Sequence, residues 1–497
     1  MLTATLLLLL LAIAVLSRRH VGLCWWKDSR ELPGPWALPF VGNLFHMFHS
    51  DLPIHFLDLA QRYGPIYRLR LGNKDIVILN NSDLIHEALV QKWSDFAGRP
   101  HGFVGNLISY GGKDLSLGNY TPAWRLQRKM THVSFQRCLR GNMEQIVQTQ
   151  ARYLCKVFHS YDGEPVNLAR DFSLQACWII CTVLFGPMDA STVEELLDCI
   201  YKLVEKWSAI SVQVVDVLPI LKVFPNTNLR HLLSYVKARD AFVQREMKKH
   251  QESHHPSEGQ DVVDHMLQFL RDHGAGKSRD AGLEPDHIHM AIVDMLIGGT
   301  DTTATLLTWA VAFLVHHPQI QERIHKELAT VVGTDRDPTY RDREHLPYLN
   351  ATILETLRMR PSAVLALPHM TIRDTSLSGF SIPKGTTVIA NLYGAHHAES
   401  TWNRPLEFRP ERFLEDDTSG EAQRHLVPFS CGARVCLGEA LGRMESFVFL
   451  AHILRDFQIL PQSPGCLPDL KGQFGMIVHC KPFMVRLVPW VVADPAK

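Results

Sequence analysis

A short glycine-rich segment near the C-terminus carries the most reactive group that the sequence offers. It runs from Phe429 to Gly438 and reads Phe-Ser-Cys-Gly-Ala-Arg-Val-Cys-Leu-Gly. Small neighbours let the backbone around Cys436 approach a flat macrocycle, and Arg434 stands two residues earlier, where it can pair with a propionate. A cysteine thiolate on haem iron pushes electron density onto the metal and favours O–O cleavage. The pattern therefore predicts a haem-iron loop with Cys436 as the axial ligand and oxygenation as the chemistry.

A second polar segment lies inside a long apolar helix predicted from Asp286 to His317. Residues 298 to 303 read Gly-Gly-Thr-Asp-Thr-Thr. Two glycines inside a helix cost roughly 1 kcal/mol each relative to alanine, so their presence favours a function, such as letting a bulky ligand lie against the backbone. A hydroxyl beside a carboxylate offers a proton path to a buried reaction centre. Asp301 and Thr302 are therefore predicted to deliver protons.

Two spacings place polar side chains on one face of a helix. Trp124 and Arg128 are four positions apart, so both can reach the same propionate. Glu355 and Arg358 are three positions apart and bring opposite charges together. Arg99, in Ala-Gly-Arg-Pro, is a further basic candidate for the propionates.

These patterns resemble those of the cytochrome P-450 monooxygenases. Residues 429 to 438 fill every fixed place of the superfamily's haem-binding signature F-x-x-G-x-R-x-C-x-G. The segment around Asp301 is similar to the oxygen-activating motif of the superfamily, and the spacings of Trp124 with Arg128 and of Glu355 with Arg358 also match it. The resemblance implies a haem b cofactor whose iron Cys436 binds.

The same resemblance assigns roles to residues elsewhere in the chain. Arg412, in Phe-Arg-Pro-Glu-Arg-Phe, matches the arginine that joins Glu355 and Arg358 in a buried network holding the cysteine loop. His369, in Leu-Ala-Leu-Pro-His, stands where a basic residue commonly binds a propionate. The residues expected to bind the cofactor are therefore Arg99, Trp124, Arg128, His369, Arg434 and Cys436.

The resemblance is closer to the steroid hydroxylases of the superfamily, in stretches that begin at Trp93, Asp114, Val214 and Val293. In those enzymes an arginine above the pocket binds the steroid's 3-keto oxygen, and Arg239 matches it; Asp294 matches a pocket-lining aspartate. The implied reaction is hydroxylation of C21 of progesterone and 17α-hydroxyprogesterone. Phe-Pro-Asn at positions 224 to 226 leaves 17α-hydroxylation as one alternative. A haem-thiolate isomerase or sensor is the alternative outside oxygenation.

The elements that must position these residues are mostly helices. A period of 3.6 residues marks the long helices, whereas a period of two marks a hairpin and two further β regions. The expected fold is mainly α with small β-sheets, the cytochrome P-450 fold: a single large haem domain at 45–497 behind a proline-rich hinge at 27–44 and a membrane anchor at 1–26. The predicted helices cover 143–158, 193–207, 229–249 and 439–457, and the predicted β regions cover 66–79, 371–392 and 476–488.

The first 26 residues are predicted to anchor the protein in a membrane. Residues 2 to 16 are almost purely apolar, and Arg18 and Arg19 follow this run instead of preceding it. Cations on that flank stay in the cytoplasm by the positive-inside tendency, so an uncleaved anchor is expected, with a cleaved signal peptide as the alternative. The expected location is the endoplasmic reticulum membrane, with the catalytic domain facing the cytosol.

Composition and motifs also bear on the partners. The 51 basic side chains (Lys and Arg) balance 51 acidic ones, so net charge gives no argument for nucleic acid. Ten cysteines in 497 residues fit a reducing compartment. No dinucleotide-binding glycine motif is present, so NADPH is expected to act only through a flavoprotein reductase docking near Arg125, Lys129 and Arg137.

Overall fold

The computed structural model describes residues 31–72, 74–217, 219–252, 261–272, 282–415 and 419–490. The predicted anchor at 1–26 and the start of the predicted hinge lie outside these residues. The chain forms two compact units. Within the described residues, unit 1 comprises those from 31 to Pro100, Leu365–Ala398 and Cys431–Arg434, and unit 2 comprises those of His101–Val364, of Glu399–Ser430 and from Val435 to 490.

Unit 1 is built on a four-stranded sheet of order β1-β2-β6-β3. The predicted hairpin is confirmed: β1 pairs antiparallel with β2, with Ile66 opposite Leu79. Strand β2 also pairs in parallel with β6, and β6 pairs antiparallel with β3. The described elements of this unit are η1 (Leu44–Phe48), α2 (Leu52–Tyr63), β1 (Ile66–Leu71), β2 (Lys74–Leu79), α3 (Ser82–His86), η2 (Glu87–Gln91), α4 (Trp93–Phe96), β3 (His369–Met370), β4 (Thr375–Leu377), β5 (Phe380–Ile382), β6 (Thr387–Ala390), α17 (Leu392–His397) and η6 (Gly432–Arg434).

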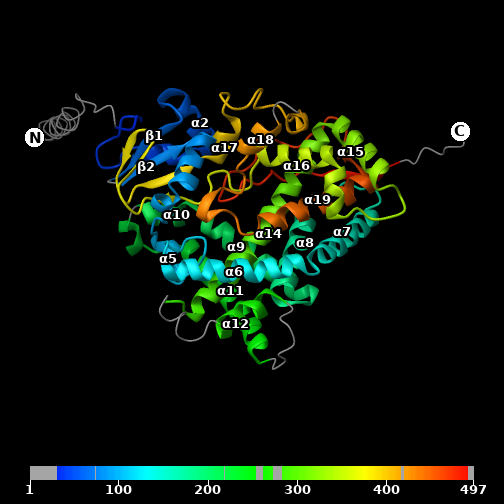
Figure 1. Ribbon diagram of the computed structural model, residues 1–497, viewed down its shortest axis with the longest axis horizontal. Helices are drawn as coiled ribbons and strands as arrows, with labels where there is room; N and C mark the ends of the chain where they lie inside the picture. Colours follow the sequence, from blue (N-terminus) through cyan, green and yellow to red (C-terminus); the bar gives the residue numbers. More distant parts are fainter. Residues whose placement is uncertain are drawn as a thin grey trace, which may run out of the picture. The chain divides into compact units, whose positions relative to one another are not determined.

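Unit 2 is predominantly helical (Figure 1). All four predicted long helices are present, as α7, α9, α11 and α19. The described elements of this unit are α5 (Phe103–Ile108), α6 (Pro122–Arg140), α7 (Met143–Ser160), α8 (Ala169–Phe185), α9 (Ala190–Ser208), α10 (Ile210–Val217), η3 (Pro219–Val223), α11 (Thr227–Glu252), α12 (Val262–Asp272), α14 (Pro285–His316), α15 (Pro318–Val331), η4 (Tyr340–His345), α16 (Pro347–Met359), η5 (Pro410–Phe413), α18 (Ser419–His425), α19 (Glu439–Asp456), β7 (Phe457–Pro461) and β8 (Val485–Pro489).

Helix α14 forms the core of unit 2. It is apolar on all sides, which is the pattern of a helix enclosed by other elements, and it packs against α6, α8, α11, α16 and α19. The predicted extent, 286 to 317, agrees with the observed Pro285–His316. The polar segment at 298–303 is therefore held at the centre of the unit.

The two glycines of α14 have different surroundings. A Cβ on Gly299 would lie 2.8 Å from Ile180 Cγ1 of α8, so this glycine allows α8 and α14 to pack closely. A Cβ on Gly298 would meet nothing within 4 Å, and Gly298 is exposed although most of the helix is buried. The sequence suggested that both glycines let a ligand lie against the helix backbone. In the structure only Gly298 has its backbone open for such a contact.

The β region predicted at 476–488 is only partly confirmed. One strand, β8, begins there at Val485 and pairs antiparallel with β7, where Phe457 stands opposite Pro489. The period-two pattern identified β8 correctly but not its partner, which follows directly after α19 without a turn signal. The fold class, mainly α with small sheets, is confirmed.

Among the described residues, no single helix has the length and apolarity needed to cross a membrane. The pair α8 and α9 meets that test only together, with a bend of 109° between them. Eleven residues of α8 are buried within the protein.

Candidate active site

The sulfur of Cys436 stands at the N-terminal end of α19. The backbone N–H of Cys436 donates to the carbonyl of Phe429, at 3.0 Å, which closes the loop before the helix. Burial raises the pKa of the Cys436 thiol, while N–H groups of Gly438 and Glu439 that bond the sulfur oppose this shift. The side chain is nevertheless accessible to solvent. An accessible sulfur that receives N–H donors at a helix N-terminus is suited to act as a thiolate ligand.

The neighbouring Cys431 has a different environment. Burial raises its pKa to about 12, and no N–H donor opposes that shift. Gly432, next to it, has a φ of 72°, and a Cβ there would lie 1.6 Å from the carbonyl oxygen of Leu89. This glycine is thus required by the close approach of two backbone segments in unit 1, not by a macrocycle as the sequence suggested.

The residues expected to bind propionates divide between the units. In unit 2, Arg128 donates to the carbonyl of Val435, immediately before Cys436, and lies over the ring of Trp124 at 5.9 Å. The indole N–H of Trp124 donates to the carbonyl of Leu115 at 3.0 Å. Arg128 is therefore tied to the cysteine loop directly, and Trp124 supports it from behind.

In unit 1, three basic side chains gather around one turn. Arg434 donates to the carbonyl of Ala97 at 2.9 Å, and Arg99 donates to the carbonyls of Leu367 and Pro368 at 2.9 Å. His369 bonds the carbonyl of Phe96 through Nδ1. Burial, and then the charges of Arg99 and Arg434, hold the pKa of His369 well below its usual value. The guanidinium groups of Arg99 and Arg434 provide a favourable environment for an anion, so this region fits the propionates of a haem.

In the middle of α14, Asp301 and Thr302 have separate partners. Thr302 Oγ1 donates to the carbonyl of Gly298 at 2.7 Å, next to the open side of the helix. The carboxylate of Asp301 is buried and bonds His479 Nε2 at 2.8 Å. The His479 side chain is 43% exposed, so it connects the buried carboxylate to solvent.

The predicted charged network is present and fully enclosed. Arg358 bonds both oxygens of Glu355, at 2.7 and 2.9 Å, and Arg412 bonds Oε1 of the same carboxylate at 3.0 Å. Both arginines also donate to backbone carbonyls, including that of Glu407. Within this network Glu355 and Arg358 have no exposed side-chain surface. Through bonds to backbone groups between 403 and 409, the three side chains hold that segment against α16.

The two residues predicted to contact substrate occupy different settings. Arg239 lies on α11 and is 2% exposed, so it is not a surface arginine. It donates to the carbonyl of Ile108, which belongs to an apolar cluster with Leu232 and Val236. Asp294 instead accepts bonds from Ser116 Oγ and from the N–H groups of Leu115 and Ser116. Its carboxylate thus braces the 115–116 turn against α14.

Glu445 on α19 is a buried acid that sequence reasoning missed. It is 1% exposed, a hydrogen bond links it to Thr303 of α14, and its Oε1 has no partner among the described residues. Burial raises the pKa of Glu445 to about 8, and the bond with Thr303 opposes this shift. The signal in the sequence was a lone glutamate beside the apolar run at 447–451. A neutral acid therefore connects the helix after the cysteine loop to the helix that carries Thr302.

This protonated state predicts a pH dependence of stability. The folded protein keeps the proton of Glu445 up to a pH of about 8, whereas the unfolded chain loses it above about 4.5, so the free energy of unfolding falls as pH rises through this window. The amide of Glu445→Gln mimics the neutral acid and does not titrate. Relative to this variant, the free energy of unfolding of the wild type should fall by up to about 1.4 kcal/mol per pH unit. Urea unfolding across this range measures the difference. The exposed acid Glu421 serves as control: Glu421→Gln should leave the slope unchanged, and parallel curves for wild type and Glu445→Gln would contradict a neutral Glu445.

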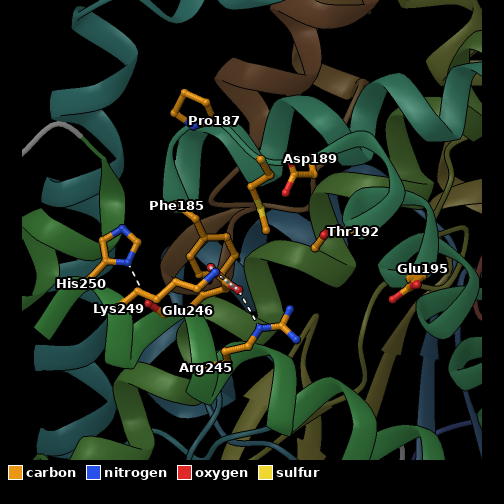
Figure 2. A pocket seen from close by; sticks show the side chains of 10 residues that line it. Phe185, Pro187, Asp189, Thr192, Glu195, Arg245, Glu246, Lys249 and His250 are labelled. Atoms are coloured by element: carbon orange, nitrogen blue, oxygen red, sulfur yellow. Dashed lines mark hydrogen bonds and ion pairs between the residues drawn. The ribbon is translucent and has the colours of Figure 1, made fainter. Parts of the chain in front are cut away.

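A separate cavity of about 620 Å³ lies elsewhere in unit 2, between the end of α8, the start of α9 and the end of α11. Figure 2 shows Arg245 and Lys249 converging on Glu246, whose carboxylate they bond at 3.0 and 2.8 Å. Phe185 lies beside these charges. None of the predicted site residues lines this cavity, and its buried carboxylate is already paired.

Comparison with known proteins identifies relatives along most of the chain. Residues 32–487 match the family model described as Cytochrome P450. Steroid 21-hydroxylase from Homo sapiens is 43% identical over 97% of this chain and 97% of its own length, and steroid 21-hydroxylase from Bos taurus is 42% identical over 97% and 96%. A solved zebra fish cytochrome P450 structure with progesterone has a TM-score of 0.80 at 33% identity, covering 88% of this chain and 99% of its own. Another structure of a zebra fish cytochrome P450, with abiraterone, has a TM-score of 0.79 at 31% identity, covering 89% and 100%.

Proposed function

Because this chain belongs to the cytochrome P450 family and is a haem-thiolate monooxygenase, we propose that it hydroxylates C21 of progesterone and 17α-hydroxyprogesterone. The observation that carries the proposal is the buried guanidinium of Arg239 beside an apolar cluster, in a chain that also presents an accessible Cys436. A steroid is a rigid apolar body with an oxygen at each end. An apolar environment with one buried guanidinium suits such a molecule.

The haem that Cys436 and the basic groups would hold supplies oxygen activation when it is bound. The chain's own residues set the conditions for that chemistry. Cys436 provides the sulfur, with N–H donors that favour its ionised form. Arg128, Arg99, His369 and Arg434 are proposed to hold the propionates. Gly298 leaves the centre of α14 open, so a steroid can lie against the backbone there.

Protons are proposed to reach the reaction centre through Asp301 and Thr302. His479 is partly exposed, it bonds the buried Asp301, and Thr302 follows Asp301 on α14 beside the open backbone of Gly298. Although burial lowers it, the hydrogen bond and the charge of Asp301 raise the pKa of His479 above its usual value, which favours a proton on this imidazole. The relay therefore starts at solvent and ends at a hydroxyl.

Thr302→Ala is expected to uncouple the reaction without preventing steroid binding, because a proton relay acts after the substrate is in place. General acid catalysis contributes roughly a hundredfold or more, so hydroxylated product should fall by about that factor per NADPH consumed, while peroxide rises. Product, peroxide and NADPH measured in one reaction test this. Thr305→Ala, one helical turn further on a buried face of α14, is the control. Unchanged coupling in Thr302→Ala would contradict the relay.

Electrons are proposed to come from NADPH through a flavoprotein reductase. Arg125, Lys129 and Arg137 are exposed on α6, the same helix whose Arg128 contacts the cysteine loop. A basic face on that helix is suited to an acidic partner. We also propose residues 45–497 as the haem domain, tethered to the endoplasmic reticulum membrane and its lipid by 1–26 through the hinge at 27–44, with the domain facing the cytosol.

Incubation with progesterone, reductase and NADPH, followed by product analysis, tests the reaction itself. A 21-hydroxylated product supports the proposal. A 17α-hydroxylated product would favour the alternative regiochemistry, and an isomerised product without oxygen uptake would exclude oxygenation. The same assay with 17α-hydroxyprogesterone tests the second substrate.

Arg239→Ala tests the contact with substrate. A charge-assisted hydrogen bond contributes about 1.5–3 kcal/mol, so 3-keto steroids should bind roughly ten- to a hundredfold more weakly. Steroids with a 3-hydroxyl accept a weaker bond and should lose less. Spectral titration of the haem protein measures both losses. Equal losses for the two classes would indicate a general collapse of the pocket and not a lost contact.

A further inference from the structure

Arg239 belongs to a buried cluster that the reaction as proposed does not explain. Its Nε and Nη2 bond Oδ1 of Asp240 at 2.8 and 2.7 Å, and Nη2 also donates to the carbonyl of Ile108 at 3.0 Å. His289 Nε2 of α14 bonds the same Oδ1 at 3.1 Å. The ring of Tyr110 stacks on His289, with centroids 5.4 Å apart and planes 5° apart.

The members of this cluster hold each other in defined charge states. Although burial alone would raise it, the bonds from His289 and Arg239 hold the pKa of Asp240 below its usual value, so Asp240 is ionised. An ionised carboxylate only accepts, which means that His289 carries its proton on Nε2. Burial, and then the charge of Asp240, raise the pKa of Tyr110 to about 12, so its hydroxyl stays neutral.

This arrangement leaves one nitrogen of Arg239 for a ligand. Two of its three guanidinium nitrogens are engaged by Asp240 and Ile108, and among the described residues no bond is formed by Nη1. Its positive charge is balanced by the adjacent carboxylate at 2.7 Å, and the side chains of Arg239 and Asp240 are 2% and 11% exposed. A ligand at Nη1 therefore meets one guanidinium nitrogen whose positive charge the adjacent carboxylate balances.

We infer that Asp240, held by His289, balances the charge of Arg239 and leaves one of its nitrogens for the ligand, so that this contact admits steroids with an uncharged ring-A oxygen and rejects those with an anionic ester at that position. The inference rests on the proposed function, since it assumes that Arg239 meets the steroid. A ketone or hydroxyl needs only one donor. A sulfate ester brings a full negative charge next to Asp240, where a buried charge without a counter-charge is costly. Asp240 and His289 are thus positioning residues that decide specificity through Arg239.

The experiment compares neutral and anionic ligands on the haem-loaded enzyme. Progesterone, pregnenolone and pregnenolone 3-sulfate are titrated against the wild type, Arg239→Ala, Asp240→Asn and the control Glu252→Gln. Glu252→Gln makes the same change of net charge at an exposed site on the same helix. The wild type should bind the sulfate at least a hundredfold more weakly than pregnenolone. Asp240→Asn should narrow that ratio at least tenfold, because it unmasks the arginine's charge, and Glu252→Gln should leave the ratio unchanged.

The outcomes separate the inference from the function on which it rests. If neutral steroids bind weakly or not at all in the wild type, or bind without any dependence on Arg239, the proposed function fails. If neutral steroids bind and their binding depends on Arg239, the proposed function stands. If Asp240→Asn then keeps the wild-type ratio of affinities for pregnenolone and its sulfate, only the inference is overturned. Should Asp240→Asn not fold, the wild type decides alone: equal affinity for pregnenolone and its sulfate overturns the inference, and the hundredfold preference supports it.

Discussion

Replacing Cys436 with serine is expected to remove the thiolate-type absorption band of the reduced, carbon monoxide-bound protein and to reduce hydroxylation to background. A serine hydroxyl stays protonated near neutral pH, so it cannot give iron the electron density that favours O–O cleavage. The N–H groups of Gly438 and Glu439 that stabilise the sulfur anion would then face a neutral group. The spectrum of the purified variant measures this independently of turnover.

Cys431→Ser is the matched control. Cys431 belongs to the same ten-residue segment, but burial raises its pKa to about 12 and no N–H donor counters this, so it is held as a thiol. The thiolate band and the activity should both survive this substitution. A thiolate-type band retained in Cys436→Ser, or lost only in Cys431→Ser, would contradict the assignment.

Glu355→Ala is expected to destabilise the protein by about 3–5 kcal/mol. The substitution leaves Arg358 and Arg412 buried without the carboxylate that both bond, and uncompensated buried charges carry a penalty of this size. Urea unfolding followed by far-UV circular dichroism and by haem absorbance measures the loss. Because the network pins the segment at 403–409, haem absorbance should change at lower urea than in the wild type.

An exposed ion pair supplies the comparison for this prediction. Arg170 and Asp198 are 3.0 Å apart, with about half or more of each side chain exposed. Asp198→Ala should therefore cost less than about 1 kcal/mol. If Glu355→Ala costs no more than Asp198→Ala, the buried network does not support the fold in the way its geometry suggests.

Sequence reasoning succeeded where the determining contacts are local. The spacing of Glu355 and Arg358 within one helix turn fixes their pairing, and the residues between Phe429 and Cys436 close their own loop. The long apolar run between 286 and 317 could only be an enclosed helix.

The sequence could not reveal partners brought together by tertiary packing. His479 bonds Asp301 across 178 positions, and His289 reaches Asp240 across 49. Neither pair has a periodic or spacing signal. Asp294 was matched to a pocket-lining aspartate by resemblance alone. That resemblance could not reveal that its carboxylate accepts bonds from the N–H groups of Leu115 and Ser116. The partner of β8 was missed for the same reason.

The discontinuity of unit 1 has a consequence for synthesis on the ribosome. Strand β2 pairs with β6, about 310 residues further along the chain. At roughly 5–20 residues per second, β2 emerges some 15–60 s before its partner exists. During that interval Val77, Ile78 and Leu79, which are buried in the finished sheet, lack β6 on one edge of the strand, and such an edge invites pairing with other chains. The nascent protein should therefore depend on chaperones until translation has passed residue 390, and fragments that end before β6 should aggregate.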